Sequence, residues 1–580
     1  MRRLVICAVL LALAAAGCGG GGEPRSPSGA PVAKQGGEVR FLTAADVDFV
    51  DPGQTYYTFG YLVQYAVNRP LYSFSPEDDG RPRPDLAEGD PQVSADQKTV
   101  TVRLKAGVRY APPVGRAVAA RDVKYAIERA FSANVPNGYA FSYFADIVGA
   151  PAAPTKGVRE IRGIEAPDDR TLVIRLERPV AATVSAALAM PITVPVPEER
   201  AAEHDRRSPS DYDRYVAFTG PYMIRNDGAG KLVGRDPSGR IELVRNPNWS
   251  RAGDYRPAYL DAITIETGNS DLTVAARRAL RGDGLMCCDQ QPPTAVLREA
   301  LRGRPRQVGR VSGGSTLWIA LNTKRAPFDD LDVRRAVLAG FDREALRLTR
   351  GGREVGPIAQ HFIPPGTPGF DESGGEQGFP ELDYMRDPGG DRTLAARYLR
   401  AAGYASGRYE GKATVTAIAS NAEPDKQTAA VAQQQLEELG FDVELRNMAP
   451  ETVFSKFCGV PASGYSACPN VGWARDFPDP QSLLEPTFKG AAILPQGNVN
   501  WSQLDEPEID AAIARAAALP VGEGRIRAWA EINRMVVERA AAIPYVWTDA
   551  FQLASPDVRG VMNPYSATWD LSFSSVRPEG

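Results

Sequence analysis

Cysteine thiols provide the clearest covalent chemistry in the later part of the chain. Cys458 and Cys468 are separated by a short segment that contains Gly459, Pro461 and Gly464, and a segment of this composition can bend back on itself. We therefore predict a Cys458–Cys468 disulfide, which would stabilise the fold by about 3 kcal/mol through chain entropy.

Cys287 and Cys288 are adjacent in the sequence and leave three possibilities open. They could form a strained vicinal disulfide, pair elsewhere or stay reduced, since four cysteines allow three full pairings. A zinc site is disfavoured because the spacing of the cysteines does not match that of zinc ligands.

Residues suited to catalysis are scarce. The two histidines, His204 and His361, each lack a second His or Cys at ligand spacing, which argues against zinc hydrolysis and weakens any Ser/His mechanism. Asp46, Asp48 and Asp51 miss the spacing of a calcium loop, and the chain has no Walker loop, G-x-G-x-x-G or G-x-S-x-G motif. We expect neither an enzyme nor a bound cofactor or metal, and we interpret both histidines as solvated or structural.

The N-terminus is typical of an exported protein. Two arginines precede an unbroken apolar run over 4–16, and as a helix this run would reach only about 20 Å, short of the roughly 30 Å hydrocarbon core. Residues 1–17 therefore indicate a secretory signal peptide. The small residues before Cys18 resemble a bacterial lipobox, which implies acylation of Cys18, although Ala15 stands where a lipobox usually carries Leu. The alternative is an ordinary signal peptide with Cys18 incidental.

The expected product is a globular protein tethered outside the cytoplasmic membrane. Residues 18–37 are rich in Gly, Pro and Ser and predict a flexible tether, and two or three acyl chains at Cys18 would hold the protein durably. No later stretch approaches the roughly 18 apolar residues of a membrane-spanning helix. We expect a lipid-anchored protein at the bacterial cell surface or in the periplasm.

Composition indicates a large soluble protein. Hydrophobic residues make up 43% and charged residues 24% of the 580 residues, and the formal net charge is −4. These values are ordinary for a globular chain, and nothing in them suggests nucleic acid as a partner. A chain of this length exceeds one typical core, so we expect two or three lobes.

Hydrophobic periodicity predicts helices and strands in both halves of the chain. A strand, a helix with Gly just past its end, and a second strand are predicted at 413–419, 426–439 and 441–445, which indicates a βαβ unit with parallel strands. Further strands are predicted at 39–42, 99–104 and 171–176, further helices at 122–131, 331–348, 394–402, 508–519 and 525–541, and an extended run from residue 544. The predicted fold class is α/β, or mixed α+β, in several lobes.

Short segments spread over nearly the whole mature chain resemble one family by their order and spacing. They include Val50-Asp51-Pro52, Asn68-Arg69-Pro70-Leu71-Tyr72, Gly220-Pro221-Tyr222, Arg245-Asn246-Pro247-Asn248-Trp249, Ala326-Pro327-Phe328-Asp329-Asp330 and Gly472-Trp473-Ala474-Arg475-Asp476-Phe477-Pro478-Asp479-Pro480. They resemble the large solute-binding lipoproteins of ABC importers for oligopeptides and dipeptides, extracellular solute-binding protein family 5. The chain departs from the family at 111–115, where His-Asp-Gly is usual, and at Ala119, where Thr would cap the next helix.

The resemblance implies a two-lobed clamp with an additional inserted domain. Lobe I would comprise 38–71, 191–314 and 548–580, the inserted domain II would comprise 72–190, and lobe II would comprise 315–547. The hinge would lie at the crossings near 314 and 547, where a few backbone torsions absorb closure.

The same resemblance implies a receptor that captures peptides between its lobes and performs no chemical step. Its partners would be the peptide, a membrane permease with its ATPases, and the membrane itself, and we expect a monomer. The alternatives are a receptor of the same family for another solute, such as an oligosaccharide, an opine-like compound or a metal chelate, or an extracytoplasmic sensor that no longer transports. An exported hydrolase is the third interpretation.

In relatives with this Trp-x-x-Asp-aromatic pattern, the carboxylate receives the α-amino group of the peptide, which assigns that role to Asp476. A carboxylate–ammonium hydrogen bond contributes about 1.5–3 kcal/mol. Trp473 and Phe477 could supply flat apolar walls, and Arg475 could bind a ligand carboxylate, pair with Asp476 or lie at the surface. The competing interpretation is that Asp476 caps a turn, a role that we give to Asp479.

Further aromatic and amide residues are weaker candidates. Tyr56 and Tyr57 follow Asp51-Pro52 and could face the cleft, although packed or exposed tyrosines are the alternative. Trp318 is expected in the core, and Asn498 and Asn500 are not assigned to the site.

Overall fold

The computed structural model describes residues 33–55, 58–78, 81–137, 139–236 and 239–578, and one large mixed sheet runs through it. The strands follow the order β15 (Val443–Met448), β14 (Val415–Ser420), β16 (Ala467–Ala474), β13 (Val308–Leu321), β17 (Ala542–Ala554), β12 (Leu285–Cys287), β1 (Glu38–Leu42), β11 (Ala262–Glu266), β10 (Arg240–Arg245) and β8 (Tyr222–Ile224), with β9 (Arg235–Asp236) paired to β10. The predicted α/β class is confirmed, and the structure has two lobes.

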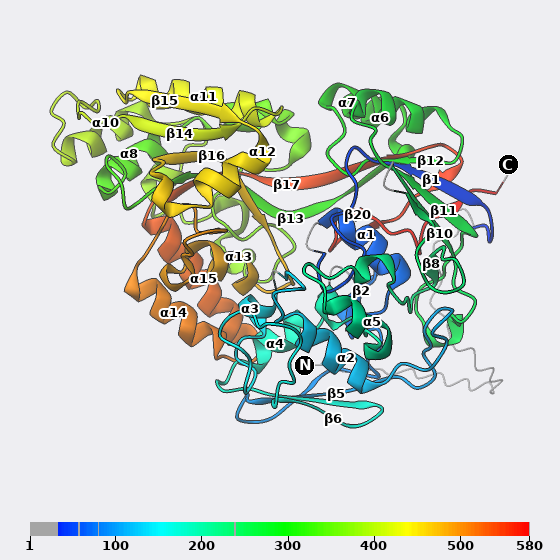
Figure 1. Ribbon diagram of the computed structural model, residues 1–580. Coiled ribbons are helices and arrows are strands. Elements are labelled where there is room, and N and C mark those ends of the chain that lie inside the picture. The colour runs from blue at the N-terminus through cyan, green and yellow to red at the C-terminus, as the bar shows by residue number, and fades with distance from the viewer. Residues whose placement is uncertain (1–32, 56–57, 79–80, 138, 237–238, 579–580) are drawn as a thin grey trace, which may run out of the picture.

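The long strands β13 and β17 form an antiparallel ribbon that joins the two halves of the sheet (Figure 1). Val308 pairs with Leu553 at one end and Ala320 with Ala542 at the other. The register shifts between Ser312 and Ser315, where Gly314 adopts a φ of +60°. Residues other than glycine rarely adopt a positive φ, so glycine suits this irregular point in the ribbon.

Lobe II contains the predicted βαβ unit. Strands β14 and β15 are parallel, with Val415 opposite Val443, and α11 (Asp425–Glu438) connects them. Its buried core also takes side chains from α8 (Leu331–Gly340), α9 (Arg343–Thr349), α10 (Arg392–Ala401), α14 (Pro507–Ala517) and α15 (Glu523–Glu538). The helices predicted at 394–402, 426–439, 508–519 and 525–541 are therefore confirmed.

The single helix predicted at 331–348 is wrong, because the structure has two helices there. Helix α8 ends at Gly340, and α9 begins at Arg343. The carboxylate of Asp342 accepts a hydrogen bond of 2.8 Å from the backbone N–H of Ala345. An Asp at this position caps the start of a helix, and Asp342 therefore separates two helices whose apolar residues follow one continuous pattern.

Lobe I surrounds the other half of the sheet. Helices α6 (Leu272–Arg281) and α7 (Thr294–Gly303) cover one side, where they share a small apolar core with Leu42 and Leu553. Helices α1 (Thr58–Val67) and α5 (Glu198–Asp205) lie closer to the inserted segment in Figure 1. The strand predicted at 39–42 is confirmed by β1.

The inserted segment has its own antiparallel sheet, with the order β4 (Gln92–Val93), β5 (Thr99–Arg103), β7 (Thr171–Arg175) and β6 (Ile164–Asp168). It also contains α2 (Ala120–Arg129), α3 (Ala140–Tyr143) and α4 (Ala181–Ala187). The strands predicted at 99–104 and 171–176 and the helix at 122–131 are confirmed. Ala119 lacks the side-chain cap of Thr, but its backbone N–H still donates to the carboxylate of Asp122 at 2.9 Å.

A buried ion cluster attaches the inserted segment to lobe I. Arg129 in α2 bonds Asp51 at 2.7 Å and Asp205 at 2.6 Å, and all three side chains are almost completely buried. Breaking a buried pair by removing one partner is strongly destabilising. Helix α2 is therefore joined to the loop at Asp51 and to the end of α5 by more than the covalent chain.

The described residues contain two disulfides. Cys458 is bonded to Cys468 at the start of β16, with a Cα–Cα distance of 6.3 Å, and Cys287 is bonded to Cys288 at the end of β12. Of the three possibilities left open for the adjacent pair, the structure thus contains the vicinal disulfide.

Among the described residues, no helix is both long enough and apolar enough to span a bilayer. The signal sequence at 1–17 and Cys18 lie outside the described residues.

Candidate ligand-binding site

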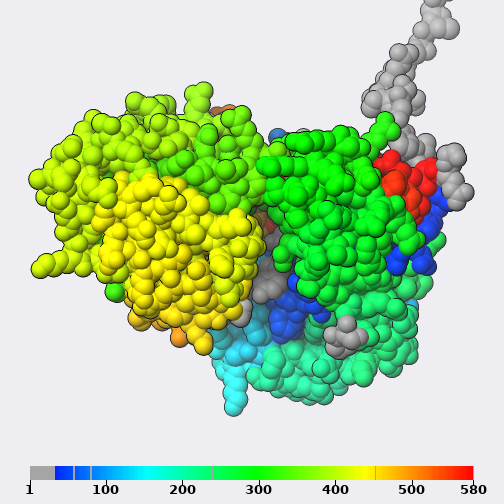
Figure 2. Space-filling model, turned by 90° about the horizontal axis from the view of Figure 1, so that it is seen from above, coloured from blue at the N-terminus to red at the C-terminus, as the bar shows by residue number. Residues whose placement is uncertain are grey.

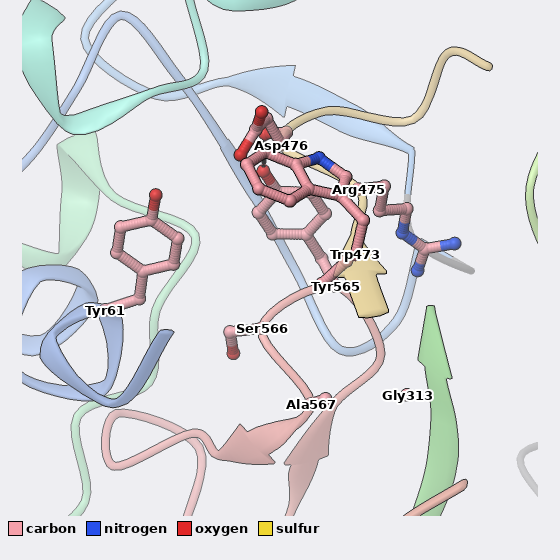
Figure 3. A pocket seen from close by; sticks show the side chains of 9 residues that line it. Tyr61, Gly313, Trp473, Arg475, Asp476, Tyr565, Ser566 and Ala567 are labelled. Carbon is pink, nitrogen blue, oxygen red and sulfur yellow. Dashed lines mark hydrogen bonds between the residues drawn. The ribbon is translucent and has the colours of Figure 1, made fainter. Parts of the chain in front are cut away.

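A cavity of about 170 Å³ lies where the two lobes meet. Its walls come from four separate parts of the chain (Figure 3), and the lining residues are Tyr61, Gly313, Trp473, Ala474, Arg475, Asp476, Tyr565, Ser566 and Ala567. Seen from above, a furrow runs between the lobe II atoms and the lobe I atoms (Figure 2).

The main wall is the end of β16. This strand pairs with β13, so that Trp473 lies opposite Thr316 and Ala474 opposite Ser315, just beyond the irregular point of the ribbon. The chain leaves the strand after Ala474, and the next two residues therefore project where the lobes cross. The disulfide at Cys468 holds the beginning of the same strand.

Asp476 is half-buried at the cavity wall. The hydroxyl of Tyr143 in α3 donates a hydrogen bond to its carboxylate, and the hydroxyl of Tyr565 donates to its main-chain carbonyl. Burial raises the pKa of Asp476 to about 7, and the hydrogen bond from Tyr143 opposes this rise. A carboxylate with such a pKa, in a cavity between two lobes, is a candidate for binding a cationic group.

Arg475 lies beside the same cavity but turns away from Asp476 (Figure 3). Its guanidinium donates to the carbonyls of Gly366 and Pro564 at 3.0 Å each and to the Thr367 hydroxyl at 3.1 Å. The residue is only 8% exposed, and burial lowers the pKa of Arg475. The surface position that we considered is wrong, and within the described residues no ion pair joins Arg475 to Asp476.

Trp473 contributes an apolar wall. Its indole N–H donates to the carbonyl of Ser482 at 2.9 Å, which fixes the ring against the following turn. The ring also packs near Trp501, with centroids 6.1 Å apart. The residue is half-buried and lines the cavity.

Phe477 departs from expectation, because its side chain does not line the cavity. It is completely buried among side chains of the inserted segment and meets the ring of Tyr143 edge-on, with centroids 4.9 Å apart. Phe477 therefore packs against the core that surrounds α3 and the four-stranded sheet. The aromatic residue beside the carboxylate thus joins lobe II to domain II.

The other candidates fall outside the cavity wall. Asp479 accepts a hydrogen bond from the backbone of Gln481 at 2.9 Å and pairs with Arg525 at 2.7 Å, which confirms it as a turn residue. Trp318 is buried in the lobe II core as expected. The two asparagines at 498 and 500 are buried and hydrogen-bonded within their own loop.

Tyr56 and Tyr57 lie outside the described residues, and their place in the site stays a prediction.

Sequence reasoning missed several residues of the site. Tyr61 comes from α1, Tyr565 from the turn between β19 (Met562–Asn563) and β20 (Thr568–Trp569), and Tyr143 from the inserted segment. Tyr565 stacks on Phe74 with centroids 3.5 Å apart. Nothing in the neighbouring sequence distinguishes these tyrosines from ordinary core residues.

The histidines are structural. His204 is buried and contacts Asp211 at 2.9 Å, whereas His361 is buried among Phe370, Phe379 and Trp547. Of the two roles expected for the histidines, solvated or structural, the structure shows the structural one for both. In the part of the chain that the structure describes, no three His, Cys, Asp or Glu side chains are grouped to hold a metal ion.

Comparison with known proteins agrees with this architecture. The oligopeptide-binding protein OppA of Bacillus subtilis is 25% identical over 494 residues, which cover 84% of this chain and 83% of that protein. The solved structure of clavulanic acid biosynthesis oligopeptide binding protein 2 is 26% identical and superposes with a TM-score of 0.80, covering 94% of this chain and 97% of that one. The structure of Haemophilus influenzae OppA in complex with RPPGFSPFR is 21% identical, with a TM-score of 0.69, and covers 95% and 100% of the two chains.

The family assignment rests on the length of the matched segment. Residues 81–494 match the family described as bacterial extracellular solute-binding proteins, family 5 middle. The match includes the inserted sheet, the ribbon strand β13 and the cavity residues of β16. The chain therefore belongs to the family 5 bacterial extracellular solute-binding proteins.

Proposed function

We propose that this protein is the extracytoplasmic receptor of an ABC importer that captures peptides between its lobes. The observation that carries the proposal is Asp476, a carboxylate at the wall of the cavity where the lobes meet. Every peptide with a free N-terminus offers an ammonium group, and Asp476 is placed to bind it. The names of the relatives, which include oligopeptide-binding proteins, support the same solute class.

Closure would couple binding to transport. The ribbon of β13 and β17 is the hinge in this proposal, and lobe II (315–547) moves against lobe I and domain II. A ligand shifts this equilibrium only if it binds the closed form better than the open form. The closed, loaded receptor then docks on a membrane permease whose ATPases drive import, and the receptor itself makes or breaks no covalent bond.

The anchor is a separate part of the proposal. Acylation of Cys18 and the tether at 18–37 hold the monomeric receptor to the outer face of the cytoplasmic membrane, within reach of the permease. The support is the lipobox-like sequence and the short apolar run before it.

The test is peptide binding by wild type and by Asp476→Asn, measured by calorimetry with pooled peptides. We expect the variant to bind more weakly by about 2 kcal/mol, because it loses a charged hydrogen bond. The matched control is Asp442→Asn, whose exposed carboxylate accepts from the hydroxyl of Thr414 away from the cavity. Equal affinity in wild type and Asp476→Asn would remove Asp476 from the site, and no binding of any peptide would overturn the proposed solute class.

A further inference from the structure

A strongly basic surface lies on lobe I, over α6 and α7. Residues 271–310 contain eight arginines and four acidic residues, whereas the whole chain has a formal net charge of −4. Six of these arginines have exposed side chains that form no ion pair with any residue that the structure describes. We call them the basic face: Arg277, Arg278 and Arg281 in α6, Arg302 in α7, and Arg304 and Arg306 just beyond α7.

The acidic side chains of the same segment mostly have other partners. Asp271 accepts hydrogen bonds from the first backbone N–H groups of α6. Asp283 pairs with Arg40 at 2.6 Å, and Asp289 accepts from two backbone N–H groups in the loop after β1. Glu299 is the fourth acidic residue, and it forms no ion pair within the described residues. The positive charge of the basic face is therefore largely uncompensated by its own segment.

One apolar side chain lies among these arginines. Val274 is 54% exposed, and it lies about one turn before Arg277 and Arg278 and about two turns before Arg281, so that all four share one side of α6. Arginine can bind a phosphate group through two parallel hydrogen bonds. Apolar side chains next to cations are typical of helices that lie at the headgroup layer of a bilayer.

The tether joins the folded protein beside the basic face. The carbonyl of Gly284, just past the end of α6, accepts a hydrogen bond of 2.9 Å from the backbone of β1. The side chain of Arg577 donates to the carbonyl of Arg306 at 3.4 Å, and the neighbouring Val576 packs closely against the backbone at Gly37. Both ends of the basic face therefore lie next to the point where the tether meets β1.

We propose that the basic face binds the phosphate headgroups of anionic lipids in the membrane that holds the anchor. This inference rests on the anchor at Cys18 in the proposed function. A flexible chain as long as the tether has a root-mean-square length of about 25 Å, so acyl chains at Cys18 would keep the face close to the bilayer.

The position of the face gives lipid binding a consequence for transport. Helices α6 and α7 lie at the top of lobe I in Figure 1, and they therefore face the viewer in Figure 2, beside the furrow. Lipid bound to the basic face turns this side of the protein toward the membrane. The furrow then opens toward the bilayer, where the permease of the proposed function lies.

The basic face orients the protein and does not replace the anchor. Attraction between exposed arginines and lipid phosphates is screened by salt, and stable attachment combines an acyl chain with a second signal such as a basic patch. A protein without acyl chains should therefore still leave the membrane at physiological salt.

Vesicle binding by unacylated protein tests the face separately from the anchor. The exported Cys18→Ser protein is sedimented with vesicles of phosphatidylcholine alone or of phosphatidylcholine with one third phosphatidylglycerol. At low salt we expect binding to the anionic vesicles and at least tenfold weaker binding to the neutral ones. Raising the salt to about 150 mM should weaken the binding several-fold, because the Debye length falls to about 8 Å.

A triple variant locates the binding on this face. The substitutions are Arg277→Gln, Arg278→Gln and Arg281→Gln. They should weaken binding to the anionic vesicles at least tenfold, since each arginine near an anionic surface adds to the attraction. The matched control changes the net charge equally, and it should bind as the parent protein does. It replaces three arginines that are exposed on lobe II, through Arg325→Gln, Arg400→Gln and Arg515→Gln.

The results distinguish this inference from the proposed function. Absence of binding to anionic vesicles at low salt would overturn it, as would equal binding by the triple variant and its parent. An equal loss in the control would also overturn it, because net charge alone would then explain the attraction. A triple variant that binds vesicles normally but imports less peptide in cells would assign the face to the permease instead. Peptide affinity and the anchor are measured without vesicles, so these results leave both unchanged.

Discussion

Tyr143 and Asp476 lie 333 residues apart in the sequence, yet the tyrosine hydroxyl donates a hydrogen bond to the carboxylate across the boundary between two domains. The same tyrosine ring packs against Phe477. The contact therefore has a polar and an apolar part, and both join domain II to the end of β16. The tyrosine hydroxyl is also an uncharged donor to the carboxylate that we propose binds the ligand.

Ligand binding should follow a bell-shaped pH profile. Asp476 must be ionised to bind an ammonium group, and burial raises its pKa to about 7. Affinity should fall about tenfold per pH unit below that value, and again above pH ~8, where the peptide amine loses its proton. Calorimetry between pH 5 and pH 9 measures the profile.

Tyr143→Phe tests whether Asp476 sets the acid limb of this profile, because it removes the hydrogen bond that lowers the pKa of Asp476. The acid limb should then move to higher pH. An acid limb that stays in place would show that Tyr143 does not act on the ionisation of Asp476.

The disulfide at the start of β16 should stabilise the protein. Replacing both Cys458 and Cys468 by Ser should lower the free energy of unfolding by about 3 kcal/mol, because the unfolded chain regains the freedom of the closed loop. Denaturant unfolding under non-reducing conditions measures the change. A reductant should destabilise wild type more than the double variant, and equal sensitivity of the two proteins would count against this role.

His361 should make the protein less stable in acid. Burial lowers the pKa of His361 to about 3, so the unfolded state binds a proton near pH 6.5 that the folded state does not bind. Between pH 6.5 and pH 5 this difference should lower the free energy of unfolding by about 2 kcal/mol. Unfolding of wild type and His361→Gln at both pH values should show this loss in wild type alone, and parallel losses would contradict the assignment.

Cys18→Ser should release the protein from the membrane. The acyl chains that we assign to Cys18 would be absent, and an unacylated tether has little affinity for a bilayer. Fractionation followed by immunoblotting should find the variant in the medium or periplasm and wild type in the membrane. A variant that stays with the membrane would defeat the lipid anchor.

Regular elements were the most predictable part of the fold. The βαβ unit of β14, α11 and β15 follows from clear helical and alternating patterns, and a glycine marks the end of its helix. The break at Asp342 was missed because the apolar pattern continues through it. An N-cap residue starts a new helix by accepting hydrogen bonds from its first backbone N–H groups, which periodicity does not report.

Only those site residues that lie together in one segment of the sequence could be predicted. The pattern around Asp476 identified the end of β16, but an aromatic residue next to a charge looks the same whether it faces a ligand or a core, and Phe477 proved to be buried. Tyr143 and Tyr565 come from 333 and 89 residues away. Only the three-dimensional fold brings these residues to the carboxylate.

If the ribbon of β13 and β17 is the hinge that we propose, its length determines how far the lobes move. β13 has 14 residues, which as a strand extend over about 45 Å, and the register shift at Ser312–Ser315 lies along it rather than at an end. A twist of about 10° there would displace atoms about 20 Å away by about 3.5 Å. That displacement exceeds the length of a hydrogen bond. In the proposed hinge motion, a small local rotation would therefore move atoms far from the ribbon's irregular point by more than a hydrogen-bond length, while each lobe keeps its own packing, and the end of β16, which pairs at that point, would move least.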